Sequence, residues 1–338
     1  MKIALDAMGG DFAPREEVRG AIAACRELGV EVILVGDPAR IKAEMAEQPS
    51  ARSLPIEIVA ASERIGMDEH PAAAVKRKRQ ASVVVANELV RNGQAAGVVS
   101  AGNTGAAMAA SLLRLGRIPG IDRPAIAIPM PTAIGVTVLL DAGANADCTP
   151  ENLLQFGFMG AIYAERVLGL PNPRVGLLNI GEEETKGNAL ALAAYPLLAG
   201  SGLNFVGNVE GRELHRGAAE VVVCDGFVGN VVLKVSEGLA GVIFTQVKEA
   251  AAASVKGRLG GLLLRSSLRA MRNRLDYAEY GGAPLLGVDG VSIIAHGRSN
   301  ARAIRNAIRA AARAAEEGVV EVIRQSMASV SVKSPPET

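Results

Sequence analysis

The stretch AAGVVSAGNTGAAMAASLLRLG, residues 95–116, decides the fold class of this chain. Its first six residues are small or β-branched and predict a strand over Ala95–Ser100. A turn, Gly102–Gly105, follows at once and leads into an alanine- and leucine-rich run that predicts a helix. A strand that passes directly into a helix in this way is typical of parallel sheets with helical crossovers.

The same alternation of strand and helix extends through the chain. Short apolar runs predict strands at Lys2–Ala7, Val30–Val35, Ile56–Ala60, Ala125–Pro129, Val136–Asp141, Arg174–Ile180, Asn204–Val206 and Glu220–Cys224. Helices are predicted at Pro14–Leu28, Pro71–Arg91, Asn152–Leu168, Ala189–Leu198, Val228–Ala253 and Ser299–Met327. We therefore predict an α/β fold. One large domain covers residues 1–330, either single or built from two interleaved lobes, and residues 331–338 form a flexible tail.

The composition excludes several classes of protein. The 338 residues carry 36 basic and 35 acidic side chains, and the resulting net charge of +1 excludes a globally basic nucleic-acid binder. Tryptophan is absent and aromatic residues make up only 3%, which argues against a base-stacking surface. The three cysteines form no CxxC pair, which indicates a reducing compartment, and the three histidines lack metal-ligand spacing. The longest uncharged stretches, 94–113 and 125–140, contain polar residues or prolines and predict no membrane-spanning helix.

Five segments share one design, in which an apolar strand ends in small or polar residues and a helix follows. They are DAMGGD (6–11), SAGNTGA (100–106), LDAGAN (140–145), NIGEEETKGN (179–188) and CDGFVGN (224–230). In a parallel sheet such turns lie together at the carboxyl edge, so we expect one shared ligand site. Glycine lets the backbone approach a ligand closely, and helix N-terminal amides bind anions.

These turns supply most of the candidate site residues. The candidates for substrate binding are Asp6, Gly9, Gly10, Asp11, Gly102, Asn103, Thr104, Gly105, Asn145, Gly187, Asn188, Gly229 and Arg298. Lys186 adds a mobile positive charge for an anion, and Asn230 adds a neutral donor for a developing oxyanion. His296 either transfers a proton or is a hydrogen-bonded structural residue.

Several familiar catalytic motifs are missing from the sequence. It contains no phosphate loop, no dinucleotide fingerprint and no nucleophile elbow. Cys224 ends a strand, where a small buried residue is the simplest interpretation. This pattern favours a reaction in which a bound substrate anion attacks, without a protein nucleophile.

A basic amphipathic protrusion is predicted over residues 254–276. Between Ser254 and Leu275 it carries six basic residues and no acid. It either packs as a helix on a partner subunit or lies on an anionic membrane. In the second case the contacts would be Leu262, Leu263, Leu264, Arg265, Leu268 and Arg269. Gly260-Gly261 would then give a flexible apolar tip.

A second basic run, Lys76–Arg79, falls within the helix predicted over Pro71–Arg91. It is either a solvated helix face or a docking site for an acidic partner.

The motifs together resemble the bacterial phosphate acyltransferase family PlsX from Met1 to about Ala328. They are the five turns above, with Lys234 after the last of them, and EHPAAAVKRK (69–78), GGAPLLGVDG (281–290) and AHGRS (295–299). Lys186 and Asn230 match positions associated with the function of that family, and Asp225 lies in a shared motif; these three and His296 are our catalytic candidates.

The resemblance implies transfer of a fatty acyl group from acyl carrier protein to inorganic phosphate, which yields acyl phosphate for phospholipid synthesis. It implies a three-layer α/β/α sandwich with a mostly parallel sheet, related to phosphotransacetylases and isocitrate/isopropylmalate dehydrogenases, with a protruding helical hairpin. It also implies a homodimer in the cytoplasm, attached peripherally to the inner face of the cell membrane. No metal or organic cofactor and no nucleic acid is expected.

Three other functions stay open at this point. The chain could be a phosphotransacetylase that uses acyl-coenzyme A, or a dehydrogenase of related fold. It could also be a non-catalytic membrane scaffold that recruits acyl carrier protein.

Overall fold

The computed structural model describes residues 1–275 and 281–331, so the tail predicted over 331–338 lies, apart from Ser331, outside the described residues. The strands are β1 (Lys2–Asp6), β2 (Glu31–Gly36), β3 (Ile56–Ala60), β4 (Gly97–Ser100), β5 (Ala125–Pro131), β6 (Val136–Leu140), β7 (Val175–Asn179), β8 (Phe205–Glu210), β9 (Val221–Val223), β10 (Ala283–Leu286) and β11 (Val291–Ile294).

The helices that precede β5 in the chain are α1 (Arg15–Leu28), α2 (Pro38–Ala46), a 3₁₀ turn η1 (Pro49–Ser53), α3 (Pro71–Arg77), α4 (Ser82–Arg91) and α5 (Thr104–Arg114). The later helices are α6 (Pro150–Arg166), α7 (Ala189–Ala199), α8 (Gly211–Leu214), α9 (Gly226–Ala252), α10 (Val255–Leu275), α11 (Ala301–Glu316) and α12 (Val319–Ser331).

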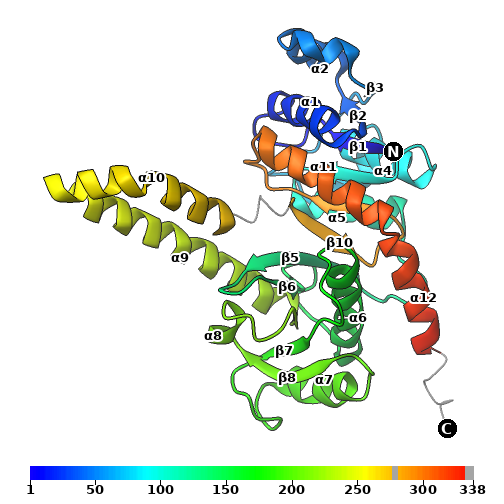
Figure 1. The fold of residues 1–338 in the computed structure, drawn as a ribbon. Helices are drawn as coiled ribbons and strands as arrows, with labels where there is room; N and C mark the ends of the chain where they lie inside the picture. The colour runs from blue at the N-terminus through cyan, green and yellow to red at the C-terminus, as the bar shows by residue number, and fades with distance from the viewer. Residues whose placement is uncertain (276–280, 332–338) are drawn as a thin grey trace.

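A single sheet joins eleven strands in the order β3-β2-β1-β4-β11-β10-β5-β6-β9-β7-β8 (Figure 1). Its first five strands are mutually parallel, and so are its last four. Between them β10 is antiparallel to both of its neighbours, and β5 is antiparallel to both β10 and β6. The two parallel halves therefore run in opposite directions.

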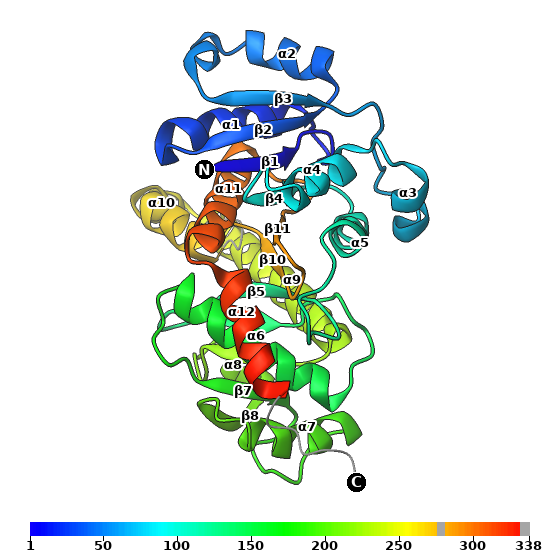
Figure 2. The same cartoon turned by 90° about the vertical axis from the view of Figure 1, so that its right-hand side faces the viewer.

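Helices cover both faces of the sheet and make three α/β/α layers (Figure 2). One face packs on α1, α6, α7, α11 and α12, and the other packs on α3, α4, α5 and the start of α9. Successive strand residues alternate between these two cores: Val138 and Leu140 join the first, and Leu139 joins the second. The predicted sandwich with a mostly parallel sheet is confirmed.

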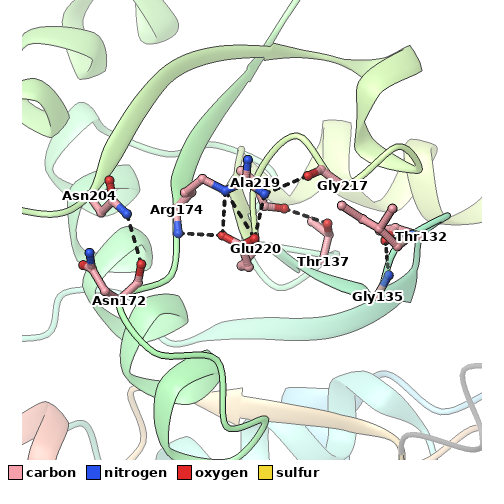
Figure 3. A network of polar contacts seen from close by, with 10 residues as sticks. Thr132, Gly135, Thr137, Asn172, Arg174, Asn204, Gly217, Ala219 and Glu220 are labelled. Carbon is pink, nitrogen blue, oxygen red and sulfur yellow. Dashed lines mark hydrogen bonds and ion pairs between the residues drawn. The ribbon is translucent and has the colours of Figure 1, made fainter.

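An ion pair fixes the register of the second half at its amino ends (Figure 3). Arg174 precedes β7 and Glu220 precedes β9; their side chains approach to 2.7 Å, and the amide of Arg174 also donates to Glu220. The guanidinium lowers the pKa of Glu220. Thr137 of β6 donates to the carbonyl of Ala219 at 2.7 Å. These contacts hold β6, β9 and β7 in register, so that the carboxyl ends of the three strands lie side by side.

The prediction of one continuous helix over residues 71–91 is wrong, because the structure has two helices there, α3 and α4. Lys78 leaves the helix at ψ 75°, and its ammonium lies 2.6 Å from a Glu69 oxygen. The Ser82 amide then donates to the Glu63 carbonyl. The basic run at 76–79 therefore crosses the end of a helix, where Arg77 also pairs with Glu69.

The prediction of one continuous helix over residues 299–327 is also wrong, because α11 and α12 are separate helices. Gly318 lies between them with φ of +60°, which ends α11 and redirects the chain.

Helices α9 and α10 form a hairpin that projects from the body of the molecule (Figure 1). The hairpin turns at Ala253–Ser254, and the Ser254 hydroxyl accepts from the Gly257 amide at 2.9 Å. The prediction of a flexible tip at Gly260-Gly261 is therefore wrong, because both glycines lie inside α10. Leu262, Leu263 and Leu264 are 64%, 74% and 56% exposed. Helix α9 is long and apolar enough to cross a membrane by length and composition alone.

Candidate active site

The polar turns fall into two groups at opposite edges of the sheet. The first group follows β1, β4 and β11, and the second follows β6, β7 and β9. The expectation that all of them share one carboxyl edge is wrong, because strand direction reverses through β10 and β5. Helix α5 of the first group and helix α9 of the second nevertheless pack into one apolar core on the same face.

In the first group, the protein's own packing explains most of the predicted residues. Asp6 is buried; its carboxylate accepts from Ser100 Oγ at 2.7 Å and from the Met8 amide at 3.1 Å. A Cβ on Gly9 would lie 2.8 Å from the Gly102 amide nitrogen, so the turns after β1 and β4 touch. A Cβ on Gly105 would likewise lie 2.7 Å from Pro71.

The remaining residues of the first group lie at its rim. The Asp11 amide donates to the Gly297 carbonyl at 2.8 Å, which joins the turn after β1 to the turn after β11. Asn103 caps α5, and its amide nitrogen donates to the Met67 carbonyl at 3.0 Å. Thr104 is exposed at the start of α5. His296 and Arg298 are exposed, and the Arg298 amide donates to His296 Nδ1 at 3.1 Å.

Glu17 of α1 lies beneath this group and was not among the residues predicted from the sequence. It is 1% exposed, and its Oε2 has no hydrogen-bond partner among the described residues. A Cβ on Gly10 would lie 2.2 Å from its Oε1. Burial, together with the nearby charge of Asp6, raises the pKa of Glu17 to about 8.

In the second group, Asp141 organises the turn after β6. Its fully buried carboxylate accepts five N–H donors at 2.7–3.1 Å: the amides of Ile126, Gly143, Ala144 and Asn145, and the Asn145 side chain. Asp141 was not among the site residues predicted from the sequence. A signal exists, because an aspartate followed by small residues is a strong acceptor for nearby amides.

The predicted residue Asn145 connects the Asp141 turn to the start of α9 through hydrogen bonds. Its side chain also donates to the Pro124 carbonyl at 2.8 Å, and its own carbonyl accepts from the Gly226 amide at 2.7 Å. A Cβ on Gly229 would lie 1.8 Å from the Asp141 carbonyl oxygen, so α9 begins in direct contact with the turn. Asn230, in the first turn of α9, is exposed beside Gly143.

The turn after β7 carries Lys186, Gly187 and Asn188. Asn179 holds it, donating from Nδ2 to the Lys186 carbonyl at 2.9 Å. Gly187 has φ of +112°, and a Cβ there would lie 2.6 Å from Asn179. Asn188 caps α7 by accepting from the Ala191 amide at 2.9 Å. The exposed Lys186 side chain is thereby carried at the entrance to α7.

A cavity of about 360 Å³ lies where the turns after β7 and β9 meet. Its polar wall comes from the N-terminal turns of two helices, at Asn188 of α7 and Asp225 of α9. Asp225 accepts from the Val228 amide at 2.9 Å and so caps α9. Helix N-termini present positive dipole ends, and at α9 the capping carboxylate of Asp225 offsets this charge, so the N-terminus of α7 is the more favourable end for an anion. Lys186 and Asn230 flank this cavity and do not line it.

Apart from Asn179 at the end of β7, the rest of the cavity wall is apolar. Its lining includes Leu153, Leu177, Leu190, Ala191, Cys224 and Val228. Burial raises the pKa of the Cys224 thiol well above its ordinary value, so Cys224 is a neutral wall residue. Leu153 comes from α6, and nothing in the sequence indicated that it would reach this site. Within residues 1–275 and 281–331, no cluster of three or more His, Cys, Asp or Glu side chains is placed to hold a metal ion.

Glu17→Gln tests whether Glu17 is neutral in the folded protein. The pKa of Glu17 is raised from 4.5 to about 8 by folding, so the folded state binds the extra proton between those pH values. Stability from this group is fully present below pH 4.5 and falls by about 1.4 kcal/mol per pH unit as the pH rises to about 8. The Glu17→Gln variant should lack this pH dependence. Urea unfolding of the wild type and the variant at pH 5 and pH 8 measures the free energy of unfolding of each. If wild type and variant differ by the same free energy at both pH values, the expectation is contradicted.

The whole chain matches known proteins. A family described as "Fatty acid synthesis protein" matches residues 1–322. Proteins named phosphate acyltransferase from Pelotomaculum thermopropionicum and Heliobacterium modesticaldum are each 57% identical to it. The alignments cover 98% and 96% of this chain, and 97% of each relative.

Solved structures show the same fold at low sequence identity. The EutD phosphotransacetylase from Staphylococcus aureus aligns with a TM-score of 0.62 and 16% identity, over 93% of this chain and 94% of that one. A phosphotransacetylase from Streptococcus pyogenes gives the same TM-score and identity over 94% of each chain. The resemblance to phosphate acyltransferases is thus confirmed: the chain belongs to the fatty acid synthesis protein family.

Proposed function

We propose that this protein transfers a fatty acyl group from the thioester of acyl carrier protein to inorganic phosphate. The observation that carries the proposal is the cavity at which the N-termini of α7 and α9 meet beside Lys186. The dipole of α7 and the Lys186 ammonium favour a small anion at the α7 side of this cavity, while the Asp225 carboxylate caps α9 on the other side. The names of the relatives, phosphate acyltransferases, indicate that the anion is phosphate and that the group transferred is acyl.

The reaction needs no protein nucleophile. An oxygen of bound hydrogenphosphate attacks the thioester carbonyl carbon, a carbon–oxygen bond forms, and the carbon–sulfur bond breaks. The departing thiolate takes the proton that hydrogenphosphate gives up, so the products are acyl phosphate and the carrier thiol. Lys186 and the helix amides position phosphate, which makes the attack effectively intramolecular.

The other catalytic candidates receive different roles. Asn230 donates to the carbonyl oxygen as negative charge develops on it. Asp225 is a positioning residue, because its carboxylate is used to cap α9. His296 belongs to the first group of turns, at the other edge of the sheet, and this mechanism gives it no step.

A basic surface beside α5 supports acyl carrier protein as the acyl donor. Lys76, Arg77 and Arg79 are exposed at the end of α3, which packs against α5. A cluster of basic side chains attracts an acidic protein partner through long-range electrostatics. The family description, fatty acid synthesis, agrees with a fatty acyl donor.

Lys186→Ala should lower kcat/KM for acyl phosphate formation by about 100-fold, because the bound anion and the transition state both lose a positive charge. The fold should be unaffected, since Lys186 is exposed. The measurement is mass detection of acyl phosphate and free carrier thiol, with Lys42→Ala on α2 as the matched control. Turnover equal to wild type would remove Lys186 from the mechanism.

The same assay separates the alternative functions. Wild-type turnover with acyl-coenzyme A but not with acyl carrier protein thioester would identify a phosphotransacetylase. Binding of the carrier protein without turnover of either donor would identify a scaffold.

We also propose that the protein is a homodimer that buries the outer face of α9. Val231, Val235, Leu239 and Ile243 repeat every four residues along this helix and are about half exposed or more. Such a stripe is typical of a helix that packs on another helix. Crossing a membrane is a poorer use of α9, because its hairpin partner α10 carries Arg258, Arg265 and Arg269, which are costly to bury in lipid.

Leu239→Asp should shift the protein from dimer to monomer, because it places a charge in the middle of this stripe. Sedimentation velocity of the wild type and the variant at equal concentration measures the shift. A wild-type chain that sediments as a monomer would exclude the dimer.

We propose that α10 makes peripheral contact with an anionic membrane on the cytoplasmic side. Exposed leucines lie beside arginines in the middle of this helix, at Leu262, Leu263, Arg265 and Arg269. Leucines inserted at the acyl boundary and arginines at headgroups make this pattern suited to a membrane surface. Leu264 and Leu268 belong to the same proposed contact.

Leu263→Glu should lower binding to anionic vesicles roughly tenfold. It removes a leucine that would insert into the lipid and adds a negative charge that the anionic headgroups repel. Co-sedimentation with phosphatidylglycerol vesicles measures the change, and Leu113→Glu on α5 is the control for an exposed leucine elsewhere. Equal binding by wild type and Leu263→Glu would instead favour packing of α10 on a partner.

A further inference from the structure

The cavity beside Lys186 has more apolar wall than the binding of phosphate requires. Its inner wall is formed by Leu153, Leu177 and Ala191, which are buried, and by Leu190. Leu153 and Leu177 are at most 2% exposed, so this wall belongs to the core of the domain. The polar residues Asn188 and Asp225 belong to the capping turns at the starts of α7 and α9.

We propose that the apolar part of this cavity receives the acyl chain and that Ala191 limits how much of the chain enters. The inference rests on the proposed function, because it places the substrate of that reaction. The thioester carbonyl must meet phosphate at the helix N-termini, and the alkyl chain leaves the carbonyl carbon on the side opposite sulfur. The adjoining apolar space is therefore available to the chain.

The chemistry of the two arms of the thioester decides which of them enters. The carrier's phosphopantetheine arm contains two amides, and an apolar cavity would leave these amides without hydrogen-bond partners. Every methylene of the acyl arm is stabilised by the same wall. Cys224 adds a neutral thiol to this wall, because burial in the protein raises its pKa. A volume of about 360 Å³ lies in the range of small-ligand pockets.

Ala191 is the position at which side-chain size sets the depth of the cavity. It lies one turn beyond the cap residue Asn188, and its amide donates to that cap. The residue is 8% exposed and lines the cavity. A larger side chain would fill part of the space and would leave the capping hydrogen bond in place, because that bond uses the backbone amide of Ala191.

Ala191→Leu should lower kcat/KM for hexadecanoyl-loaded carrier protein at least about tenfold relative to butyryl-loaded carrier protein. The KM for phosphate should stay at the wild-type value. Ala193→Leu is the matched control, since Ala193 is an exposed position of the same helix, and its chain preference should equal that of the wild type. An unchanged preference in a folded Ala191→Leu variant would overturn the proposal.

A second measurement uses the wild-type protein and does not depend on the folding of the variant. Carrier protein loaded with a decanoyl chain that ends in a diazirine is photolysed on the enzyme, and the labelled peptides are sequenced by mass spectrometry. Label on the segments that contain Leu153 of α6 or Leu177 of β7 is expected. Label confined to the α9–α10 hairpin would overturn the proposal. Failure of the proposed function is distinct, because wild type would then form no acyl phosphate from any loaded carrier.

Discussion

The carboxylate of Asp141 is the contact on which the candidate site depends. It is fully buried and accepts five N–H groups, which tie the end of β6 to the start of β5 and to the turn that follows β6. Asn145, held by this carboxylate, accepts the Gly226 amide at the start of α9. One acceptor therefore sets the position of the helix whose N-terminus forms one side of the cavity at the proposed anion site. Loss of a buried acceptor costs more than one hydrogen bond, because each released donor stays desolvated.

The direction of the strands explains how the rest of the molecule is divided. Two parallel half-sheets run oppositely because β10 and β5 are inserted antiparallel between them. The polar turns of the first half are largely consumed by the protein's own packing, at Asp6, Gly9 and Gly102. The turns of the second half border a cavity. Helix α9 starts at that cavity and continues into the hairpin, so one element connects the proposed chemistry to the proposed contacts with a partner and a membrane (Figure 1).

Most strands, and the caps at Asn103 and Asn188, were predictable, because alternating burial and capping are local properties of the chain. Two errors and one omission have separate physical causes. Lys78 turns out of its helix toward Glu69. Gly260 and Gly261 are helical because Ser254 starts α10 before them. Leu153 reaches the cavity only because α6 packs across β7 and β9.

The sequence by itself determined the alternation of strands and helices, the glycine and asparagine turns, the basic protrusion and the family resemblance, since each is written in adjacent residues. The tertiary structure alone decided which turns stand together. Strand direction in a sheet depends on which strands pair, and pairing brings together residues as distant as Leu285 and Ile126. The tertiary structure also placed Glu17 beneath Gly10 and Asp141 beneath Gly229. Burial is a property of the packed chain and of no single segment within it.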